Sequence, residues 1–562
     1  MPSPDTTRPD TRLPDTPKPP DTGRSTSTGA TVPADNDTLA PLLHRQASVR
    51  GRHPLLICDH ERLGYAEAQA RSARLARGLI AVGAGKGTHI GVLYPNGADF
   101  VIAAFAAARI GAVVVPFSTF ATTSELSRQL VDSDIRILLS IDGHRGHDYV
   151  ARLAEALPGA FARAAPRVAD RMLCPEAPQL RHIAISHRPG TGPRDIGELD
   201  RLADTVGEDL LAAMERDVTA ADPLSIIYTS GSTSAPKGVV HTHGALLAHQ
   251  RNLNEIRCLT AEDRLFCNSP FFWIGGFGFA LLATLLAGAT LVCSDAGDAS
   301  ATLDLLEAET PTVTNGFAAG VAHLARHPSF VARDLSSMRR GNLYAIMPAD
   351  ARPTDAELRH NMLGMTEAGS VVLLSGDDSD QPEHRRGSFG KPAPGFDTRI
   401  VDPDTGTDAT TGELYIRGPY VMQGYHGRSR EQCFDADGWF PTGDLVRVDD
   451  DGFFYFLGRR GAMIKTAGAN ISPAEVEKAI MKITGTPAHV LGLPDPDRGQ
   501  IVVAVLVTPD ATVDDTALRE SLRQELSAYK VPRRFAALRP GEVPLLPGGK
   551  VDIQRLGKIF DA

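Results

Sequence analysis

The chain has 562 residues, which is long enough for two or more domains and a large buried core. Hydrophobic residues make up 42% of it and charged residues 22%, a composition typical of soluble globular proteins. The net charge of −10 argues against a nucleic-acid partner held through phosphate contacts, and against binding to an anionic membrane surface.

Cysteine usage and the lack of long apolar runs favour a cytoplasmic protein. The six cysteines include no Cys-x-x-Cys pair, so the sequence predicts neither a zinc site nor a disulfide framework. The apolar run at residues 279–292 is broken by Thr284, Gly288 and Thr290, which argues against a membrane span. The N-terminus has no apolar core of a signal peptide.

Residues 1–38 differ in composition from the rest of the chain. Pro-Asp-Thr recurs at Pro4, Pro9, Pro14 and Pro20, with few apolar residues between the repeats. Such a segment cannot bury enough apolar surface to fold alone, so we expect a disordered tail outside the folded domains.

Helix-forming and strand-forming segments alternate from about residue 40 onward. Alternation of this kind predicts parallel sheets covered by helices, which is the α/β class. Residues 155–205 are richer in Pro, Arg and Asp and suggest a surface insertion. The expected helices cover residues 66–82, 99–110 and 126–130, and the expected strands cover residues 89–93, 112–115 and 135–141.

Short β segments separated by turns follow residue 395 and suggest a β-rich module that closes the large domain. An α+β unit of about a hundred residues comes next, with a hinge expected near Gly461 and Ala462. We therefore expect a large N-terminal domain of several subdomains over residues 39–458. A small, mobile α+β domain is expected over residues 459–562.

A loop rich in Gly, Ser and Thr follows the apolar run at residues 224–228. Residues 228–238 contain two glycines, five Ser or Thr hydroxyls and Lys237, which suit a strand that opens into a polyphosphate-binding loop. Pro236 precedes the lysine and Gly238 follows it, an order that differs from the Walker A loop. The alternative interpretation is a solvent-exposed linker.

Shorter motifs further along the chain also suit nucleotide chemistry. Glu367 lies beside Thr366, after an apparent helix, and suits Mg²⁺ bound to a nucleotide phosphate. Asp444 follows a Thr-Gly turn and suits two ribose hydroxyls, while Arg459 and Lys550 offer cations. Each residue also has an ordinary alternative role as a turn residue, a solvated charge or part of a frayed chain end.

Taken together and in order, these motifs resemble those of the adenylate-forming superfamily. That superfamily comprises acyl- and aryl-CoA synthetases, the adenylation domains of peptide synthetases, and luciferases. The resemblance extends from about residue 40 to the end of the chain. The matching segments are residues 228–238, 364–367, 442–444, 458–470, 473–477 and 549–550.

The resemblance implies an AMP-forming ligase that works in two steps. A carboxylate attacks the α-phosphate of Mg·ATP to give an acyl-adenylate and pyrophosphate. A thiol, usually that of CoA, then displaces AMP to give an acyl- or aryl-CoA thioester. ATP, Mg²⁺ and CoA are the cofactors that the resemblance implies.

The same resemblance implies the functional residues. Lys550, Thr366 and Glu367 are the expected catalytic residues, and Lys550 would offset the repulsion between the carboxylate and the α-phosphate. Glu367 and Thr229 are the expected metal ligands. The expected contacts to nucleotide and CoA are Thr229, Ser230, Gly231, Ser232, Thr233, Lys237, Asp444, Arg459 and Gly468.

The acid pocket is expected in the aromatic, glycine-rich segment at residues 271–279. A flat apolar slot for an aryl or medium-chain acid suits this composition, although an aromatic core helix is an equal alternative. The expected lining residues are Phe272, Trp273, Gly275 and Gly276.

Several positions depart from the superfamily pattern. Residues 270–273 lie where many members have a histidine that gates the acyl pocket, and Leu363 replaces an aromatic residue near the adenine. Residues 345–348 replace a Gly-Gly-Ala segment, and the stretch that follows them is shorter than usual. Ser234 in the phosphate loop and Ala462 at the hinge also differ.

Three other functions stay open beside CoA ligation. An enzyme that resembles the ATP-dependent aryl diazotases would activate nitrite and transfer it to an aromatic amine, and the altered adenine segment leaves room for it. A ligase could instead load the phosphopantetheine thiol of a carrier protein that acts in trans. A catalytically silent nucleotide-binding protein is the third, and retention of Lys550 speaks against it.

Overall fold

The computed structural model describes residues 38–162, 167–187, 192, 194–229, 236–460, 463–545 and 551–561. The predicted tail lies outside these residues apart from Thr38, and so does the predicted hinge at Gly461 and Ala462. Within the described part of the chain, no helix combines the length and apolar character needed to cross a membrane. The predicted domain boundaries at residues 38 and 458 stay predictions.

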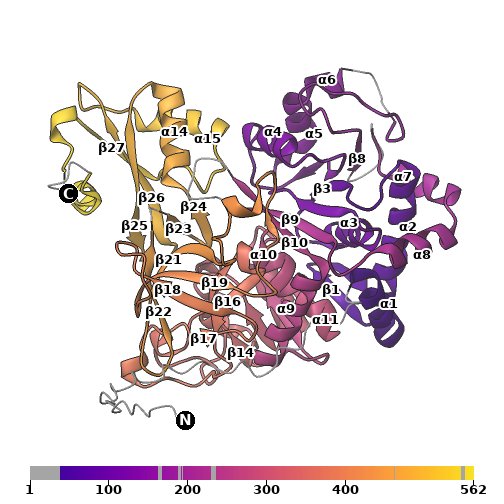
Figure 1. Cartoon of the computed structure of the whole chain (residues 1–562), viewed down its shortest axis with the longest axis horizontal. Helices are drawn as coiled ribbons and strands as arrows, with labels where there is room; N and C mark the ends of the chain where they lie inside the picture. The colour runs from indigo at the N-terminus through magenta and orange to yellow at the C-terminus, as the bar shows by residue number, and fades with distance from the viewer. Residues whose placement is uncertain are drawn as a thin grey trace, which may run out of the picture. The chain divides into compact units, whose positions relative to one another are not determined.

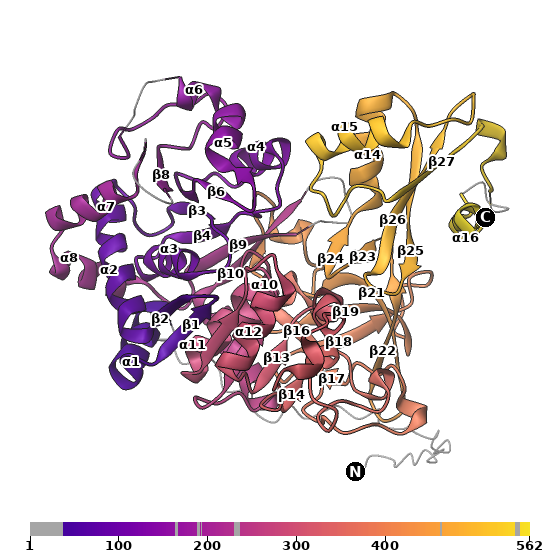
Figure 2. The same ribbon diagram turned by 180° about the vertical axis from the view of Figure 1, so that it is seen from behind.

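One seven-stranded sheet contains the two strands that flank the candidate phosphate loop in the sequence (Figure 2). Five consecutive strands of this sheet run parallel, and the two strand pairs at its other edge are antiparallel. In spatial order the strands are β20 (Gly424–Tyr425), β10 (Lys237–Thr242), β9 (Pro223–Thr229), β4 (Val113–Pro116), β3 (His89–Leu93), β5 (Ile137–Ile141) and β8 (His182–Ser186).

A second, six-stranded sheet is parallel except at one edge, where its last strand runs antiparallel. The strands in spatial order are β14 (Arg340–Gly341), β13 (Val313–Asn315), β11 (Arg264–Cys267), β12 (Thr290–Cys293), β1 (Pro54–Cys58) and β2 (Glu61–Gly64). Both sheets confirm the predicted class of parallel strands connected by helices.

The helices of this region include the three that the sequence predicts at residues 66–82, 99–110 and 126–130, each of which begins and ends within a few residues of the prediction. They are α1 (Leu39–Arg50), α2 (Tyr65–Ala81), α3 (Ala98–Arg109), α4 (Thr123–Asp132), α5 (Tyr149–Ala156), α6 (Pro158–Phe161), α7 (Gly197–Leu202), α8 (Glu208–Asp217), α9 (His243–Ile256), α10 (Ile274–Gly276), α11 (Ala283–Ala287), α12 (Ala299–Glu309) and α13 (Ala322–Ala325).

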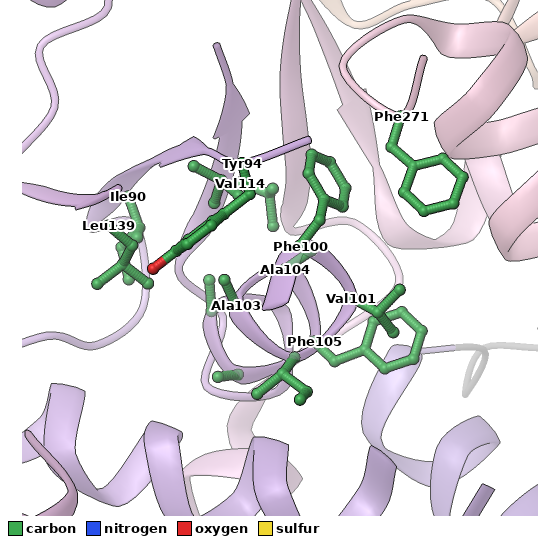
Figure 3. Close-up of a cluster of buried hydrophobic side chains, with 14 of the residues drawn as sticks. Ile90, Tyr94, Phe100, Val101, Ala103, Ala104, Phe105, Val114, Leu139 and Phe271 are labelled. Carbon is green, nitrogen blue, oxygen red and sulfur yellow. The ribbon is translucent and has the colours of Figure 1, made fainter. Parts of the chain in front are cut away.

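Helix α3 joins the cores of the two sheets. It is buried on nearly every side because its sequence is almost entirely apolar and rich in alanine, which lets neighbours approach closely. Figure 3 shows Val114 of the seven-stranded sheet close to α3, and Phe271 on the far side of Phe100. The rings of Phe100 and Phe271 meet edge to face, with their centroids 5.4 Å apart.

The predicted surface insertion at residues 155–205 is wrong in part. Residues 182–186 form β8, which pairs with β5 and is almost wholly buried. Its short apolar run is flanked by Pro- and Arg-rich segments, so the average composition of the region hides a strand that completes the sheet.

The expected helix before Gly364 is also absent from the described residues. Between β14 and Leu363 the chain forms only two short 3₁₀ turns, at Tyr344–Ile346 and Ala356–Leu358. Pro348 and Pro353 interrupt this stretch, and prolines in a helix interior remove backbone hydrogen bonds.

The C-terminal third is built from smaller sheets and two helices, α14 (Pro473–Thr484) and α15 (Asp515–Glu525), with α16 (Ile553–Gly557) last (Figure 1). This arrangement confirms the expected β-rich module and α+β unit. The β-rich module contains β15 (Leu363–Met365), β16 (Ser370–Leu374), β17 (Lys391–Pro392), β18 (Asp397–Val401), β19 (Thr411–Arg417), β21 (Phe440–Val448) and β22 (Phe454–Arg459). The α+β unit contains β23 (Ile464–Thr466), β24 (Ala469–Ile471), β25 (Ala488–Asp495), β26 (Gly499–Val507) and β27 (Arg534–Leu538).

A buried ion triad connects α4 to the C-terminal unit. Lys530 Nζ lies 2.7 Å from Glu125 Oε1 and 2.9 Å from Glu475 Oε1, and all three side chains are almost excluded from water. Burial alone would raise the pKa of Glu125, but Lys530, Ser527 and Thr122 outweigh burial and hold that pKa below its ordinary value.

Lys530→Met would leave Glu125 and Glu475 buried without their cation. We expect the free energy of unfolding to fall by about 3 kcal/mol or more, because an unpaired buried charge has lost its water without a replacement. Chemical denaturation measures this loss. Lys482→Met is the matched control, since its 2.7 Å pair with Glu525 is exposed and should contribute less than about 1 kcal/mol. Equal losses in the two variants would contradict the triad's role.

Candidate active site

The ends of the candidate phosphate loop are fixed by a β-hairpin. Thr229 at the end of β9 pairs with Lys237 at the start of β10. A side chain at Gly238 would meet Ile226 Cγ2 at 2.7 Å, so the strand is packed tightly where it leaves the loop. The predicted contacts at Ser230, Gly231, Ser232 and Thr233 lie outside the described residues, as does Lys550.

Lys237 projects into a partly buried, cationic region. Its Nζ lies 5.1 Å from the centroid of the Tyr425 ring, a cation–π distance. Burial lowers the pKa of Lys237, and the nearby charge of Arg428 lowers it further, while Glu367 opposes the shift. A phosphate at this position would gain two cations at once.

Thr366 and Glu367 sit in a short 3₁₀ turn that reverses at Gly369, where φ is +70°. The hydroxyl of Tyr425 donates a 2.7 Å hydrogen bond to Glu367 Oε1. His241 bonds the carbonyl oxygen of Thr366 through Nε2 at 2.6 Å. Burial lowers the pKa of His241 to about 4, so the ring is neutral at physiological pH and fixes the turn as a donor.

Asp444 and Arg459 face each other across β21 and β22. They are register partners, and Arg459 Nε lies 2.7 Å from Asp444 Oδ1. Burial raises the pKa of Asp444, with Arg459 and Lys465 opposing the shift and Glu367 adding to it. Asp444 therefore lies within electrostatic range of Glu367, which in turn acts on Lys237.

Lys465 belongs to the C-terminal unit and completes this cluster. Burial lowers its pKa, whereas the charge of Asp444 works to raise it. Its Nζ also lies 4.8 Å from the centroid of the Phe456 ring. Lys465 lies inside the matching segment 458–470, but the motifs predicted no role for it.

The structure thus brings four predicted residues into one charged cluster. Lys237, Glu367 and the pair of Asp444 and Arg459 come from three parts of the chain that are far apart in sequence. Thr229 pairs with Lys237 across β9 and β10, and Thr366 precedes Glu367 in the same 3₁₀ turn. A site of this composition can bind a polyanion that also presents hydroxyls.

Gly468 lies flat against an aromatic ring. It adopts φ +86° between β23 and β24, and a Cβ added there would lie 2.0 Å from Phe317 Cδ1. Only a residue without a side chain allows this approach.

Phe317 belongs to an aromatic cluster that contains two of the predicted pocket residues. The Trp273 ring lies 5.5 Å from that of Phe317 and 5.6 Å from that of Phe272, in both cases edge to face. Phe120 packs on Phe272 at 5.3 Å and is itself 39% exposed, so the cluster has an open side.

The two predicted pocket glycines support the turn that presents Trp273. A Cβ at Gly276 would lie 2.1 Å from the carbonyl oxygen of Pro270, and one at Gly275 would lie 3.1 Å from Ser269 Oγ. Phe271 and Phe277 instead pack on Phe100 in the core, so for them the core-helix alternative is correct.

Four residues of this region have no motif that would have predicted them: His241, Tyr425, Phe120 and Phe317. Phe120 and Phe317 each follow the carboxyl end of a parallel strand, β4 and β13 respectively. Open α/β sheets bind ligands at such ends, which is the signal that would have found them.

Comparison with known proteins gives family matches over most of the chain. Residues 43–426 match the model of the AMP-binding enzyme family, and residues 475–550 match that of the AMP-binding enzyme C-terminal domain. A feruloyl-CoA synthase from Amycolatopsis sp is 33% identical over 84% of this chain and 89% of its own length. Indoleacetate–CoA ligase from Aromatoleum aromaticum is 30% identical over 88% of this chain and 93% of its own.

Solved structures share the fold. An amide bond synthetase from Marinactinospora thermotolerans superposes with a TM-score of 0.73 at 23% identity, covering 93% of this chain and 99% of that one. A double mutant of o-succinylbenzoate CoA synthetase from Bacillus subtilis gives 0.70 at 25% identity, covering 92% and 98%.

Arg459→Leu would remove the cation that faces buried Asp444, so the pKa of Asp444 would rise further. A carboxyl with a raised folded-state pKa stabilises the fold only when protonated, and that contribution is lost as the pH rises through the folded pKa. We expect a deficit of about 3 kcal/mol relative to the wild type at about pH 8, shrinking toward about pH 5. Denaturation across this pH range measures it.

Arg399→Leu is the matched control for this variant. Arg399 lies on β18 of the same sheet and pairs with Asp408, which is 73% exposed. Its loss should cost less than about 1 kcal/mol. If the loss of unfolding free energy in Arg459→Leu did not change with pH, the pKa of Asp444 would not depend on Arg459.

Proposed function

The chain belongs to the AMP-binding enzyme family, as an AMP-forming acid–CoA ligase, and on that premise we propose that its acid substrate is aromatic. The family predicted from the motifs is confirmed by the two family-model matches. The single observation behind the aromatic substrate is the open-sided cluster of Phe120, Phe272, Trp273 and Phe317. Ring faces and edges of this kind favour a planar apolar ligand.

Two relatives support the same substrate class. By their names, the feruloyl-CoA synthase and the indoleacetate–CoA ligase act on acids that contain an aromatic ring. At identities near 30%, the shape of the acid pocket must be argued from this chain's own residues. In this chain the Trp273 and Phe317 rings meet edge to face and would form one side of the acid pocket.

In the first half-reaction the enzyme must bring two anions together. Lys237 would hold the phosphate groups that leave as pyrophosphate, and Lys550 would lie between the carboxylate and the α-phosphate. Asp444 would accept the ribose hydroxyls, and the charge of Arg459 opposes the rise in the pKa of Asp444 that burial causes. Holding the ribose and phosphates at once orients the α-phosphorus toward the acid.

Glu367 and Thr229 would hold Mg²⁺ together with the phosphates, and the ion would supply neutralisation of phosphate charge. The donor set fits, because a carboxylate and a hydroxyl are the hard oxygen ligands that Mg²⁺ prefers. Among the described residues, no group of three or more His, Cys, Asp or Glu side chains could hold a metal ion by itself. The ion would thus arrive with the nucleotide.

In the second half-reaction a thiol must reach the acyl carbon. Gly468 lies against Phe317, whose ring contacts Trp273 of the acid pocket. A narrow arm such as pantetheine would pass beside Gly468 and the Phe317 ring, where the glycine adds no side chain of its own.

Gly468→Ala would place a methyl group 2.0 Å from Phe317 Cδ1 and displace either the ring or the strand. We expect thioester formation to fall by about tenfold or more while acid-dependent pyrophosphate exchange changes little, because an ångström-scale displacement is costly to a positioned reaction. Gly485→Ala is the control: φ is also positive there, at +67°, but nothing lies within 4 Å. Equal losses in both half-reactions would contradict a thiol passage at Gly468.

Diazotisation with nitrite is a second candidate function. The observation that favours it is the stretch between Gly341 and Leu363, which contains no α-helix in the described residues and leaves the region before Thr366 different from the superfamily pattern. Transfer to a carrier-protein thiol and silent nucleotide binding are the two remaining candidate functions. One assay separates all four.

The deciding assay follows ATP conversion to AMP and pyrophosphate with a panel of aromatic and aliphatic acids. Each acid is tested with and without CoA, and nitrite is tested with an arylamine. We expect AMP formation to require an aromatic acid and to rise with CoA. AMP formation that requires nitrite and an amine, or that never occurs with any acid, would overturn the proposal. If thioester formation required a phosphopantetheinylated carrier protein instead of CoA, the proposed acceptor would be wrong and the proposed acid substrate would stand.

A further inference from the structure

We propose that Tyr425 is a positioning residue for the nucleotide site: its hydroxyl orients the Glu367 carboxylate, and its ring orients Lys237. The inference rests on the proposed function, because it assigns Tyr425 to the binding of Mg·ATP. Tyr425 belongs to none of the motifs that predicted the site.

The backbone places Tyr425 between the two groups. It lies on β20, where it pairs with Val239, two residues after Lys237. The amide of His426 donates to the carbonyl oxygen of Gly238 at 2.7 Å, and the amide of Met422 donates to that of Glu367 at 2.8 Å. The short segment around Tyr425 is therefore anchored to both sides of the candidate site.

The hydroxyl bond to Glu367 has a fixed direction. An ionised carboxylate can only accept, so the phenol O–H is the donor and Glu367 Oε1 is the acceptor. A hydrogen bond from O–H to a carboxylate is among the strong ones in proteins. With Oε1 engaged at 2.7 Å, the rotation of the carboxylate is restricted and Oε2 takes a defined position for a cation.

The ring acts on the cationic side of the site. Lys237 Nζ lies 5.1 Å from its centroid and Arg428 Cζ lies 5.4 Å from it. The ring quadrupole attracts both cations, which repel each other, so the tyrosine keeps the two cations near the same ring. The Phe440 ring packs on Tyr425 at 6.4 Å and fixes its plane.

Tyr425→Phe separates the two roles, because it keeps the ring and removes only the hydroxyl. We expect calorimetric titration with ATP in the presence of Mg²⁺ to show about tenfold weaker binding, which corresponds to about 1.4 kcal/mol. Binding of ATP in EDTA should change by less than about twofold, since the ring still supports Lys237. A purely structural role would weaken both titrations alike.

Tyr420→Phe is the matched control. Tyr420 is a buried tyrosine in the same connecting segment, and its ring stacks on His249 with centroids 4.9 Å apart instead of contacting Glu367. The same loss of a hydroxyl there should leave both titrations unchanged.

A double-mutant cycle with Glu367→Gln tests whether Tyr425 acts through Glu367. In that background Tyr425→Phe should weaken Mg·ATP binding by less than about twofold, because the carboxylate that it orients is gone. Three results would overturn the inference: unchanged Mg·ATP affinity in Tyr425→Phe, equal weakening with and without Mg²⁺, or losses that multiply fully in the double variant.

Failure of this inference and failure of the proposed function are distinguishable. The titrations contain no acid and no CoA, so they measure nucleotide binding whatever the substrate is. A wild type that binds Mg·ATP but forms no AMP with any acid would overturn the proposed function and leave the test of Tyr425 intact. A wild type that binds ATP equally well with and without Mg²⁺ would overturn the inference about Tyr425.

Discussion

The cost of removing charge from water governs the geometry of this site. Asp444 is buried beside Arg459 and within range of Lys465, and Glu367 accepts a bond from a phenol that cannot ionise at neutral pH. Such groups are tolerated inside a protein only where partners replace their water. The carboxylates of the site are therefore oriented before a nucleotide binds, which reduces the loss of conformational freedom on binding.

Much of this arrangement could be predicted from the sequence, because it depends on local patterns. The alternation of apolar helices and strands predicts the parallel sheets, and the loop before Lys237 has the residue types that a phosphate requires. Glu367 and Asp444 belong to short motifs that keep their order along the chain. Where a residue's position depends on a local pattern, the sequence is enough to predict that position, while the catalytic and binding roles of these residues stay predictions.

The parts that could not be predicted depend on contacts between distant segments. Tyr425 is 58 residues from Glu367, and a lone tyrosine in a turn-rich segment has no motif. Phe120 and Phe317 look like ordinary core aromatics until the ends of β4 and β13 are brought beside Trp273. The strand β8 was hidden for a different reason, since its short apolar run lies among polar residues that dominated the local average.

The ion triad of Glu125, Lys530 and Glu475 has a consequence for recombination among related enzymes. Lys530 and Glu475 lie in the C-terminal unit, whereas Glu125 lies on α4, about four hundred residues earlier in the chain. A chimera that takes its C-terminal unit from a relative without this lysine would inherit an orphan carboxylate at the junction. The stability of such a chimera therefore depends more on whether the two parents match at Glu125 and Lys530 than on their overall sequence identity.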